Sequence, residues 1–167
     1  MIILGLDPGY AIVGWGVLEY KNNHFKVIDF GAITTEAGEY FPERLSKIYS
    51  DLNFIIDKYK PQVLSMEKIF YNSNAKTVID VSQARGVITL AAYKKGLEIA
   101  EYTPLQVKQS VVGYGRAEKK QVQEMTKTIL GLAKVPKPDD TADALAMAIC
   151  HGHSSGSLLQ QMKGRTW

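Results

Sequence analysis

The chain has 167 residues, 46% of them hydrophobic, and a formal net charge of +3, which suits one compact domain and is too small a charge to indicate a polyanionic partner by itself. No apolar run reaches the roughly 18 residues of a membrane span and no secretion signal is recognisable, so we expect a cytoplasmic protein without a membrane partner. The single cysteine, Cys150, excludes an intramolecular disulfide, and its alanine-rich surroundings predict a core residue.

Three strands are predicted at the start of the chain. An apolar run of strand length begins at Ile2 and is stopped by Asp7, Pro8 and Gly9. Two more strands follow, and the Asn22-Asn23 pair supplies the turn of a hairpin between them. The predicted strands cover Ile2–Leu6, Ile12–Tyr20 and Phe25–Ile33.

Helices and strands alternate in the rest of the predicted domain. Apolar residues recur at spacings of three or four after Pro42, which is typical of an amphipathic helix, and Pro61 ends that helix. Strands are predicted over Val63–Met66 and Leu97–Tyr102, and helices over Pro42–Tyr59, Ala75–Lys95, Pro104–Gly113, Ala117–Leu130 and from Asp140 to about Ile149. The segment 154–167 is rich in serine and glycine and lacks periodicity, so we expect a domain over 1–153 followed by a mobile tail.

This order predicts an α/β fold. Three strands joined by short turns pair antiparallel, whereas strands separated by helices need right-handed crossovers and lie parallel. The expected architecture is an RNase H-like mixed five-stranded sheet, with three antiparallel strands and then parallel strands, flanked by helices.

Four acidic residues stand at the ends of predicted elements that are expected to converge. Asp7 follows the first strand, Glu67 follows the fourth, and Asp140 and Asp143 share one face of the last helix. Carboxylates brought together either bind protons with raised pKa values or bind cations, and oxygen ligands suit magnesium. Two such ions about 4 Å apart would activate a water and stabilise the leaving oxygen of a phosphodiester, without a covalent intermediate.

Each acid also has a simpler interpretation. Asp7 before Pro8 can initiate a turn, Asp140 and Asp143 have the spacing of a helix cap, and Glu67 can be a strand-end surface residue. Asp139, next to Asp140, leaves the identity of the third acid open. The cluster is favoured because three simple explanations would have to coincide where the elements converge.

Five segments carry a resemblance to a known family. They are Gly5 to Gly9, Glu67 to Phe70, Gln83 to Gly86, Gln106 to Gln109 with Val111 to Glu118, and Asp140 to Leu145. In this order they resemble the motifs of the RuvC family of Holliday-junction resolvases, and the similarity covers roughly residues 1–153. The resemblance implies an endonuclease that makes paired symmetric nicks in like-polarity strands of four-way DNA junctions, during homologous recombination and DNA repair.

The resemblance also implies ligands and partners. By position it makes Asp7, Glu67, Asp140 and Asp143 the catalytic, metal-binding acids, with two Mg²⁺ ions for each active site and Mn²⁺ as a substitute. It implies a homodimer, whose two-fold symmetry matches that of a junction. It further implies a RuvA/RuvB branch-migration complex, formed by a junction-binding tetramer and a helicase motor.

Contacts to DNA are expected from one aromatic and several basic residues. The resemblance implies that Phe70 stacks on unpaired bases, worth about 1 to 3 kcal/mol per base, and that Lys108 and Lys119 contact phosphates. Arg116 and Lys120 are added from charge alone. The simpler alternatives are a core phenylalanine and solvated helix lysines. We expect His151 and His153, after the last helix, to be surface residues.

Three other functions compete with a resolvase. The Leu6 to Gly9 turn before a hairpin also resembles the phosphate-binding turn of actin-type and sugar-kinase ATP-binding proteins, but those need a second domain. An RNase H-type nuclease for RNA–DNA hybrids would use the same four acids. A non-catalytic junction-binding module would have no need to keep all four acids.

Overall fold

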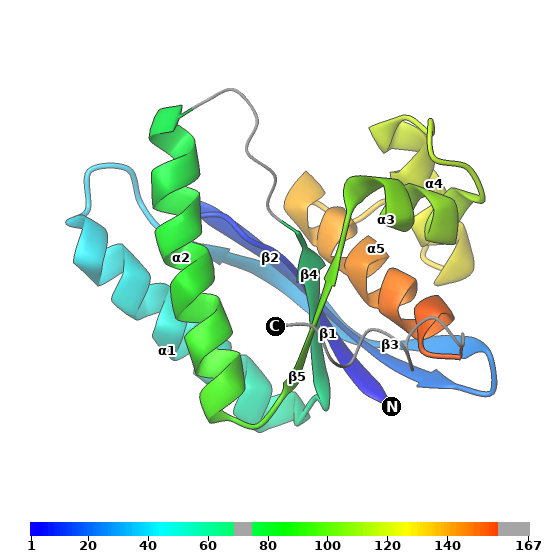
Figure 1. The fold of residues 1–167 in the computed structure, drawn as a ribbon, viewed down its shortest axis with the longest axis horizontal. Coiled ribbons are helices and arrows are strands. Elements are labelled where there is room, and N and C mark those ends of the chain that lie inside the picture. The colour runs from blue at the N-terminus through cyan, green and yellow to red at the C-terminus, as the bar shows by residue number, and fades with distance from the viewer. Residues whose placement is uncertain (69–74, 157–167) are drawn as a thin grey trace.

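The computed structural model describes residues 1–68 and 75–156, and it contains the predicted mixed sheet of five strands (Figure 1). The strand order is β3-β2-β1-β4-β5. The first three strands pair antiparallel, and β1, β4 and β5 run parallel to one another. The strands are β1 (Ile2–Asp7), β2 (Ile12–Lys21), β3 (His24–Thr34), β4 (Val63–Glu67) and β5 (Glu98–Tyr102).

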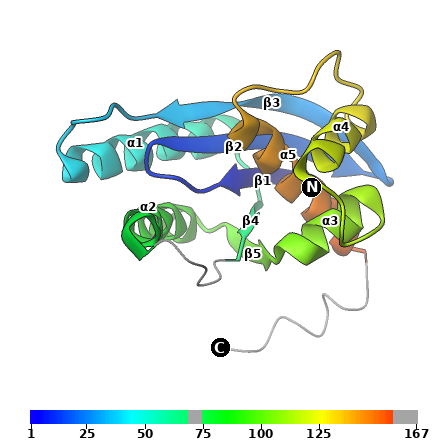
Figure 2. The ribbon, with the colours of Figure 1, turned by 90° about the horizontal axis from the view of Figure 1, so that it is seen from above.

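In the described part of the chain, five helices cover the sheet in two layers. Helices α1 and α2 lie on one face, and α5 lies on the other face with α3 and α4 beside it (Figures 1 and 2). The helices are α1 (Phe41–Tyr59), α2 (Ala75–Lys94), α3 (Pro104–Val112), α4 (Lys119–Ile129) and α5 (Asp139–Ser154). None of the helices described here is long and apolar enough to cross a membrane.

Local signals explain where several helices begin and end. Helix α1 has a proline in its first turn and ends at Lys60, which adopts the left-handed conformation just before Pro61. Thr103 caps α3 by accepting a hydrogen bond from the Gln106 amide. Glu118 caps α4, so this helix begins at Lys119 and not at Ala117 as predicted.

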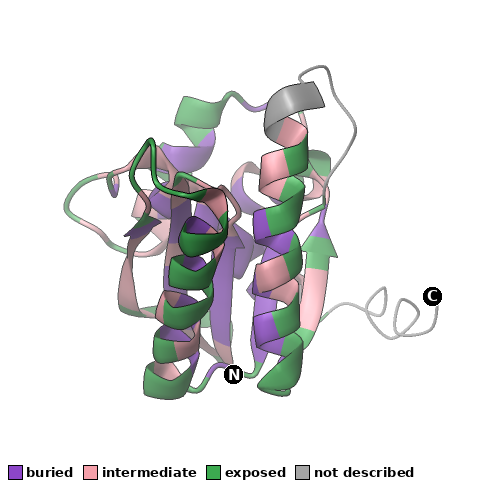
Figure 3. Cartoon of the chain, turned by 90° about the vertical axis from the view of Figure 1, so that its left-hand side faces the viewer, coloured by how far each residue is buried: buried purple, intermediate pink, exposed green. Residues whose placement is uncertain are grey.

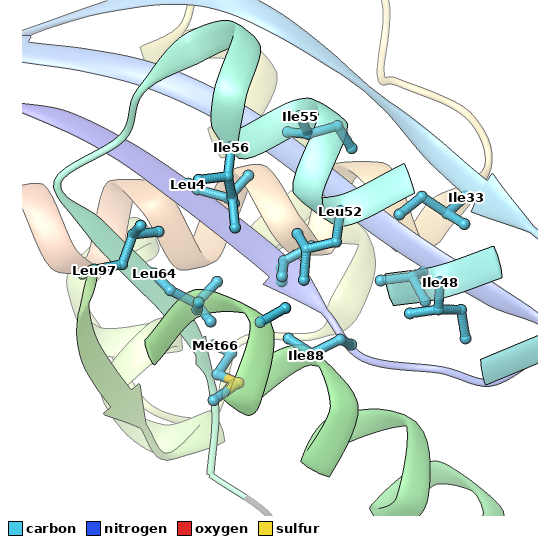
Figure 4. Packing of buried hydrophobic residues seen from close by; sticks show 14 of the residues in the cluster. Leu4, Ile33, Ile48, Leu52, Ile55, Ile56, Leu64, Met66, Ile88 and Leu97 are labelled. Carbon is cyan, nitrogen blue, oxygen red and sulfur yellow. The ribbon is translucent and has the colours of Figure 1, made fainter. Parts of the chain in front are cut away.

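Alternation along β1 and β4 divides the core into two clusters. Leu4, Leu64 and Met66 pack with α1 and α2 (Figure 4), and Leu6 belongs to the same cluster, whereas Ile3 and Val63 pack with α5. Cys150 lies buried in the second cluster, as predicted. Figure 3 shows that α1 and α2 are buried toward the sheet and exposed on the opposite side.

Candidate active site

Strand alternation directs the side chains of Asp7 and Glu67 toward α5. Because side chains alternate between the two faces, Asp7 shares the face of Gly5, whose Cβ position adjoins the Ala144 carbonyl of α5. Glu67 likewise shares the face of Ser65, whose hydroxyl donates to the carbonyl of Met147 in α5 over 2.7 Å. The parallel register pairs Gly5 with Ser65 and Leu6 with Met66, so the next residues on the two strands are Asp7 and Glu67.

Glycine lets the start of α5 approach this edge of the sheet closely. Gly14 of β2 is the register partner of Asp7. A Cβ placed on Gly14 would lie 2.0 Å from the Asp140 carbonyl oxygen, a distance that no side chain can occupy. The missing side chain therefore allows Asp140 to lie beside Asp7. Asp143 follows three residues later and projects from the same face of α5.

Asp7 lies within electrostatic range of the other three carboxylates. Burial, followed by the charges of Asp143, Asp140 and Glu67, raises the pKa of Asp7 to about 7. Burial, followed by the charge of Asp143, also raises the pKa of Glu67. The expected convergence of the four acids at one edge of the sheet is thus found in the structure.

Lys119, at the first position of α4, lies at the same edge. Its Nζ is 2.6 Å from Oδ2 of Asp143, and this contact raises the pKa of the ammonium group. Its charge also lowers the pKa values of Asp7 and Glu67. Lys119 thus offsets part of the negative charge of the carboxylate cluster.

The other predicted DNA contacts have different positions. Lys108 is half-buried, and its charge lowers the pKa of Glu67, which places it near the carboxylates. Arg116 and Lys120 are exposed between α3 and α4 and at the start of α4. Phe70 lies outside the described residues, so its contact with bases stays a prediction.

Asp139 has another partner. Its carboxylate forms an ion pair with Lys137 over 2.5 Å, and hydrogen bonding to that lysine lowers its pKa. The aspartates whose charges raise the pKa of Asp7 are Asp143 and Asp140. The geometry therefore favours Asp140 over Asp139 as the third acid.

The residues present fit a hard divalent cation. All four side chains offer carboxylate oxygens, the ligands that Mg²⁺ and Mn²⁺ prefer. As they are arranged in the described part of the chain, no three or more His, Cys, Asp or Glu side chains form a group that could hold a metal ion. The ammonium group of Lys119 contacts a carboxylate oxygen of Asp143 that a cation would use. A bound cation would lower the repulsion that now raises the pKa of Asp7.

The prediction for His151 was wrong. This side chain is only 2% exposed, and its Nδ1 lies 2.9 Å from the hydroxyl of Tyr102. Burial lowers the pKa of the imidazole and so favours its neutral form. The reason is that α5 continues to Ser154, so that its last turn packs against β5. His153 is exposed, as predicted, and contacts Ser110.

Sequence reasoning assigned no role to Arg85. It lies in α2, and its guanidinium donates a hydrogen bond of 2.5 Å to the carbonyl of Glu67. Its only sequence signal was its place in the Gln83 to Gly86 segment.

Comparisons with known proteins agree with this geometry. The family model described as crossover junction endodeoxyribonuclease RuvC matches residues 3–151. A crossover junction endodeoxyribonuclease RuvC from Ruminiclostridium cellulolyticum is 58% identical over 161 residues, which is 95% of this chain and 97% of that protein.

Solved structures give the same result for the fold. Thermus thermophilus RuvC superposes with a TM-score of 0.86 at 30% identity, covering 93% of this chain and 95% of that one. The same protein in complex with a Holliday junction substrate gives a TM-score of 0.88 at 30% identity, covering 93% and 94%. The predicted RNase H-like architecture is confirmed.

Proposed function

The chain belongs to the RuvC family of crossover junction endodeoxyribonucleases, and we propose that it cuts four-way DNA junctions with Asp7, Glu67, Asp140 and Asp143. It is a nuclease that resolves Holliday junctions. Its relatives are named crossover junction endodeoxyribonucleases, and the Thermus thermophilus relative is seen in complex with a Holliday junction substrate. The observation that carries the assignment of the site is the convergence of four carboxylates from β1, β4 and α5 at one edge of the sheet.

Nucleases of this family depend on a metal, and we propose Mg²⁺ as that metal, with two ions in each site and Mn²⁺ as a substitute. The four carboxylates would hold the cations, which when bound supply an activated water and stabilise the leaving oxygen of the phosphodiester. The protein contributes the fixed positions of the acids and a site from which part of the water is excluded. Lys119 contributes a positive charge that can move from Asp143 to a DNA phosphate.

One assay tests this proposal against its alternatives. The purified protein is incubated with a labelled four-way junction, a linear duplex and an RNA–DNA hybrid, with Mg²⁺, Mn²⁺ or EDTA. We expect symmetric nicks in the junction with either cation and intact substrates in EDTA. Preferential cutting of the hybrid would favour an RNase H-type nuclease. An intact junction together with thermal protection by ATP would favour the actin and sugar-kinase type.

Helix α2 carries an exposed apolar stripe that fits a second copy of the chain. Ile79, Leu90 and Tyr93 are 61%, 54% and 73% exposed and, with Gly86 between them, lie at helical spacing on one face. Nothing lies within 4 Å of the Cβ position of Gly86, so another helix can approach closely there. We propose a homodimer through this stripe, because a junction with two-fold symmetry presents two equivalent strands.

The substitution Tyr93→Glu is expected to separate the dimer without unfolding the chain, since the tyrosine side chain is exposed. A charge buried within an apolar contact typically costs about 2 kcal/mol or more of binding energy. Sedimentation should give a monomer, and a cruciform plasmid should accumulate nicked circles instead of linear product. Phe54→Glu is the matched control, because Phe54 is a similarly exposed aromatic residue on α1. A dimeric Tyr93→Glu protein would contradict the assignment of this surface.

Basic residues of α3, of α4 and of the segment between them, called here the basic strip, are proposed to bind the phosphates of the junction. The basic strip comprises Lys108, Arg116, Lys119 and Lys120. Lys119→Ala is expected to reduce the slope of log affinity against log salt by about 0.9, the effect of one lost phosphate contact. Fluorescence anisotropy from low to moderate salt measures this slope. Lys47→Ala is the control, because Lys47 is paired with Asp51 on α1. An unchanged slope for Lys119→Ala would remove Lys119 from the phosphate contacts.

Two further proposals follow from family membership. We propose that the nuclease acts with a RuvA/RuvB branch-migration complex, which would deliver the junction to it. We also propose that it acts in the cytoplasm. Co-purification with these partners from cell extract tests the first proposal.

A further inference from the structure

Arg85 is a charged residue of α2 that faces the sheet. Its side chain is only 11% exposed, and it reaches two strands at once. One guanidinium nitrogen donates to the carbonyl of Glu67 at the end of β4, over 2.5 Å. The other terminal nitrogen forms an ion pair with Glu101 in β5.

These contacts account for the type of residue at this position. A guanidinium group loses its bound water when it is buried, which costs free energy. Hydrogen bonds to partner groups must offset this cost. Its planar fork presents several donors in fixed directions, so it can bridge a backbone carbonyl and a carboxylate. A lysine ammonium has the same charge but lacks this geometry. Arg85 is therefore suited to holding two points of the structure at a set separation.

The two points are neighbours in the sheet at the edge where the acids converge. The register of β4 and β5 pairs Met66 with Glu101 and Glu67 with Tyr102. The amide of Lys68 also donates to the Tyr102 carbonyl over 2.8 Å, where the described chain leaves the sheet. Arg85 thus fastens the last residues of β4 to β5, at the position where Glu67 must be placed.

Arg85 approaches from the face of the sheet opposite to α5. Helix α2 covers one face, whereas the Glu67 side chain shares the face of Ser65, toward α5 (Figure 2). The guanidinium therefore holds the peptide of Glu67 without occupying the space where a cation or a phosphate would bind.

We propose that Arg85 is a positioning residue for catalysis: by tying the Glu67 carbonyl to Glu101, it fixes the Glu67 carboxylate relative to Asp7 and the start of α5. This inference rests on the proposed function, because it takes Glu67 as one of the catalytic acids. Loss of a group that orients a metal ligand typically lowers metal affinity or activity by roughly 10- to 100-fold.

The test compares Arg85→Gln, Arg85→Lys and Glu101→Ala with the unchanged protein. Single-turnover cleavage of a four-way junction at saturating enzyme gives the rate, and anisotropy in Ca²⁺ gives the affinity for the junction. A titration of thermal stability with Mn²⁺ in the absence of DNA gives metal binding without relying on activity. For Arg85→Gln we expect the cleavage rate to fall by about tenfold or more and the Mn²⁺ midpoint to rise by about tenfold. The affinity for the junction should not change. Arg85→Lys and Glu101→Ala should show smaller effects in the same direction.

Lys95→Gln serves as the matched control. Lys95 follows α2 and pairs with Asp57 of α1 over 2.6 Å, so its loss also removes an ion pair of this region, at the end far from Glu67. The proposal would be overturned if Arg85→Gln lowered the melting temperature but left the cleavage rate and the Mn²⁺ midpoint equal to those of the unchanged protein. Reduced junction affinity at an unchanged rate would instead make Arg85 a DNA contact and would also overturn it. If Arg85→Gln does not fold, Glu101→Ala decides on the same readouts. Failure of the unchanged protein to cut the junction would refute the proposed function itself, a result distinct from either of these.

Discussion

Replacing Asp7 by asparagine is expected to abolish junction cleavage and, in the absence of metal, to make the folded protein more stable at pH 8. Asparagine has the shape of aspartate but carries no charge, so it removes a cation ligand while keeping the packing. It also removes the repulsion that Asp143, Asp140 and Glu67 impose on this partly buried carboxylate. Activity and stability should therefore change in opposite directions.

The pH dependence of this gain follows from the raised pKa. The pKa of Asp7 is about 7 in the folded protein, against 3.8 for an ordinary aspartate. Because the pKa of Asp7 is higher in the folded than in the unfolded protein, protonated Asp7 favours the folded state. This stabilisation is complete below about pH 4, where Asp7 is protonated in both states, and it is lost as the pH rises to 7. Above pH 7 the loss reaches at most about 4 kcal/mol. The stability advantage of Asp7→Asn should thus vanish below pH 4, grow up to pH 7 and then level off.

Urea unfolding of both proteins at pH 4 and pH 8 in EDTA measures this difference. Added Mg²⁺ should stabilise the unchanged protein more than the variant, because only the former has all four carboxylates. The variant should still bind the junction, since the basic strip is intact. A variant that cuts normally would remove Asp7 from the site, and a variant less stable at pH 8 would refute the electrostatic explanation.

Replacing Gly14 by alanine is expected to destabilise the protein by about 3 kcal/mol or more and to cost most of the cleavage activity. The added Cβ would lie 2.0 Å from the Asp140 carbonyl oxygen and 2.8 Å from the Thr141 amide nitrogen. Both are backbone atoms, so relief requires a shift of the whole start of α5. That shift would move Asp140 away from Asp7.

Gly16→Ala provides a graded comparison on the same strand. There the added Cβ meets the side chain of Leu145, which can adjust, at 2.4 Å. We expect a loss of about 1 to 3 kcal/mol and a protein that still cuts when assayed well below its melting temperature. Thermal unfolding and single-turnover cleavage of both variants make the comparison. Equal activity in Gly14→Ala and Gly16→Ala would show that the placement of Asp140 does not depend on this close approach.

Local patterns predicted the elements, apart from some of their ends, and the positions of the candidate acids, apart from the choice between Asp139 and Asp140. An apolar run ended by Asp7, another ended by Glu67 and the acidic start of the last helix are features of neighbouring residues, and the alternation of strands and helices determines which ends meet. The antiparallel and parallel directions of the strands and the convergence of the carboxylates were therefore predictable. The motifs added the type of substrate, which spacing alone left open between a junction and a hybrid.

Tertiary packing decided which side chains pair. The Lys119–Asp143 ion pair, the Arg85 bridge from α2 to β4 and β5, and the burial of His151 against Tyr102 join residues from different elements. The sequence around a charged or polar helix residue is the same whether its side chain faces water or a strand of the sheet. Only the way the helices pack on the sheet determines that neighbour, because the free energy of burying a charge depends on the partner it finds there.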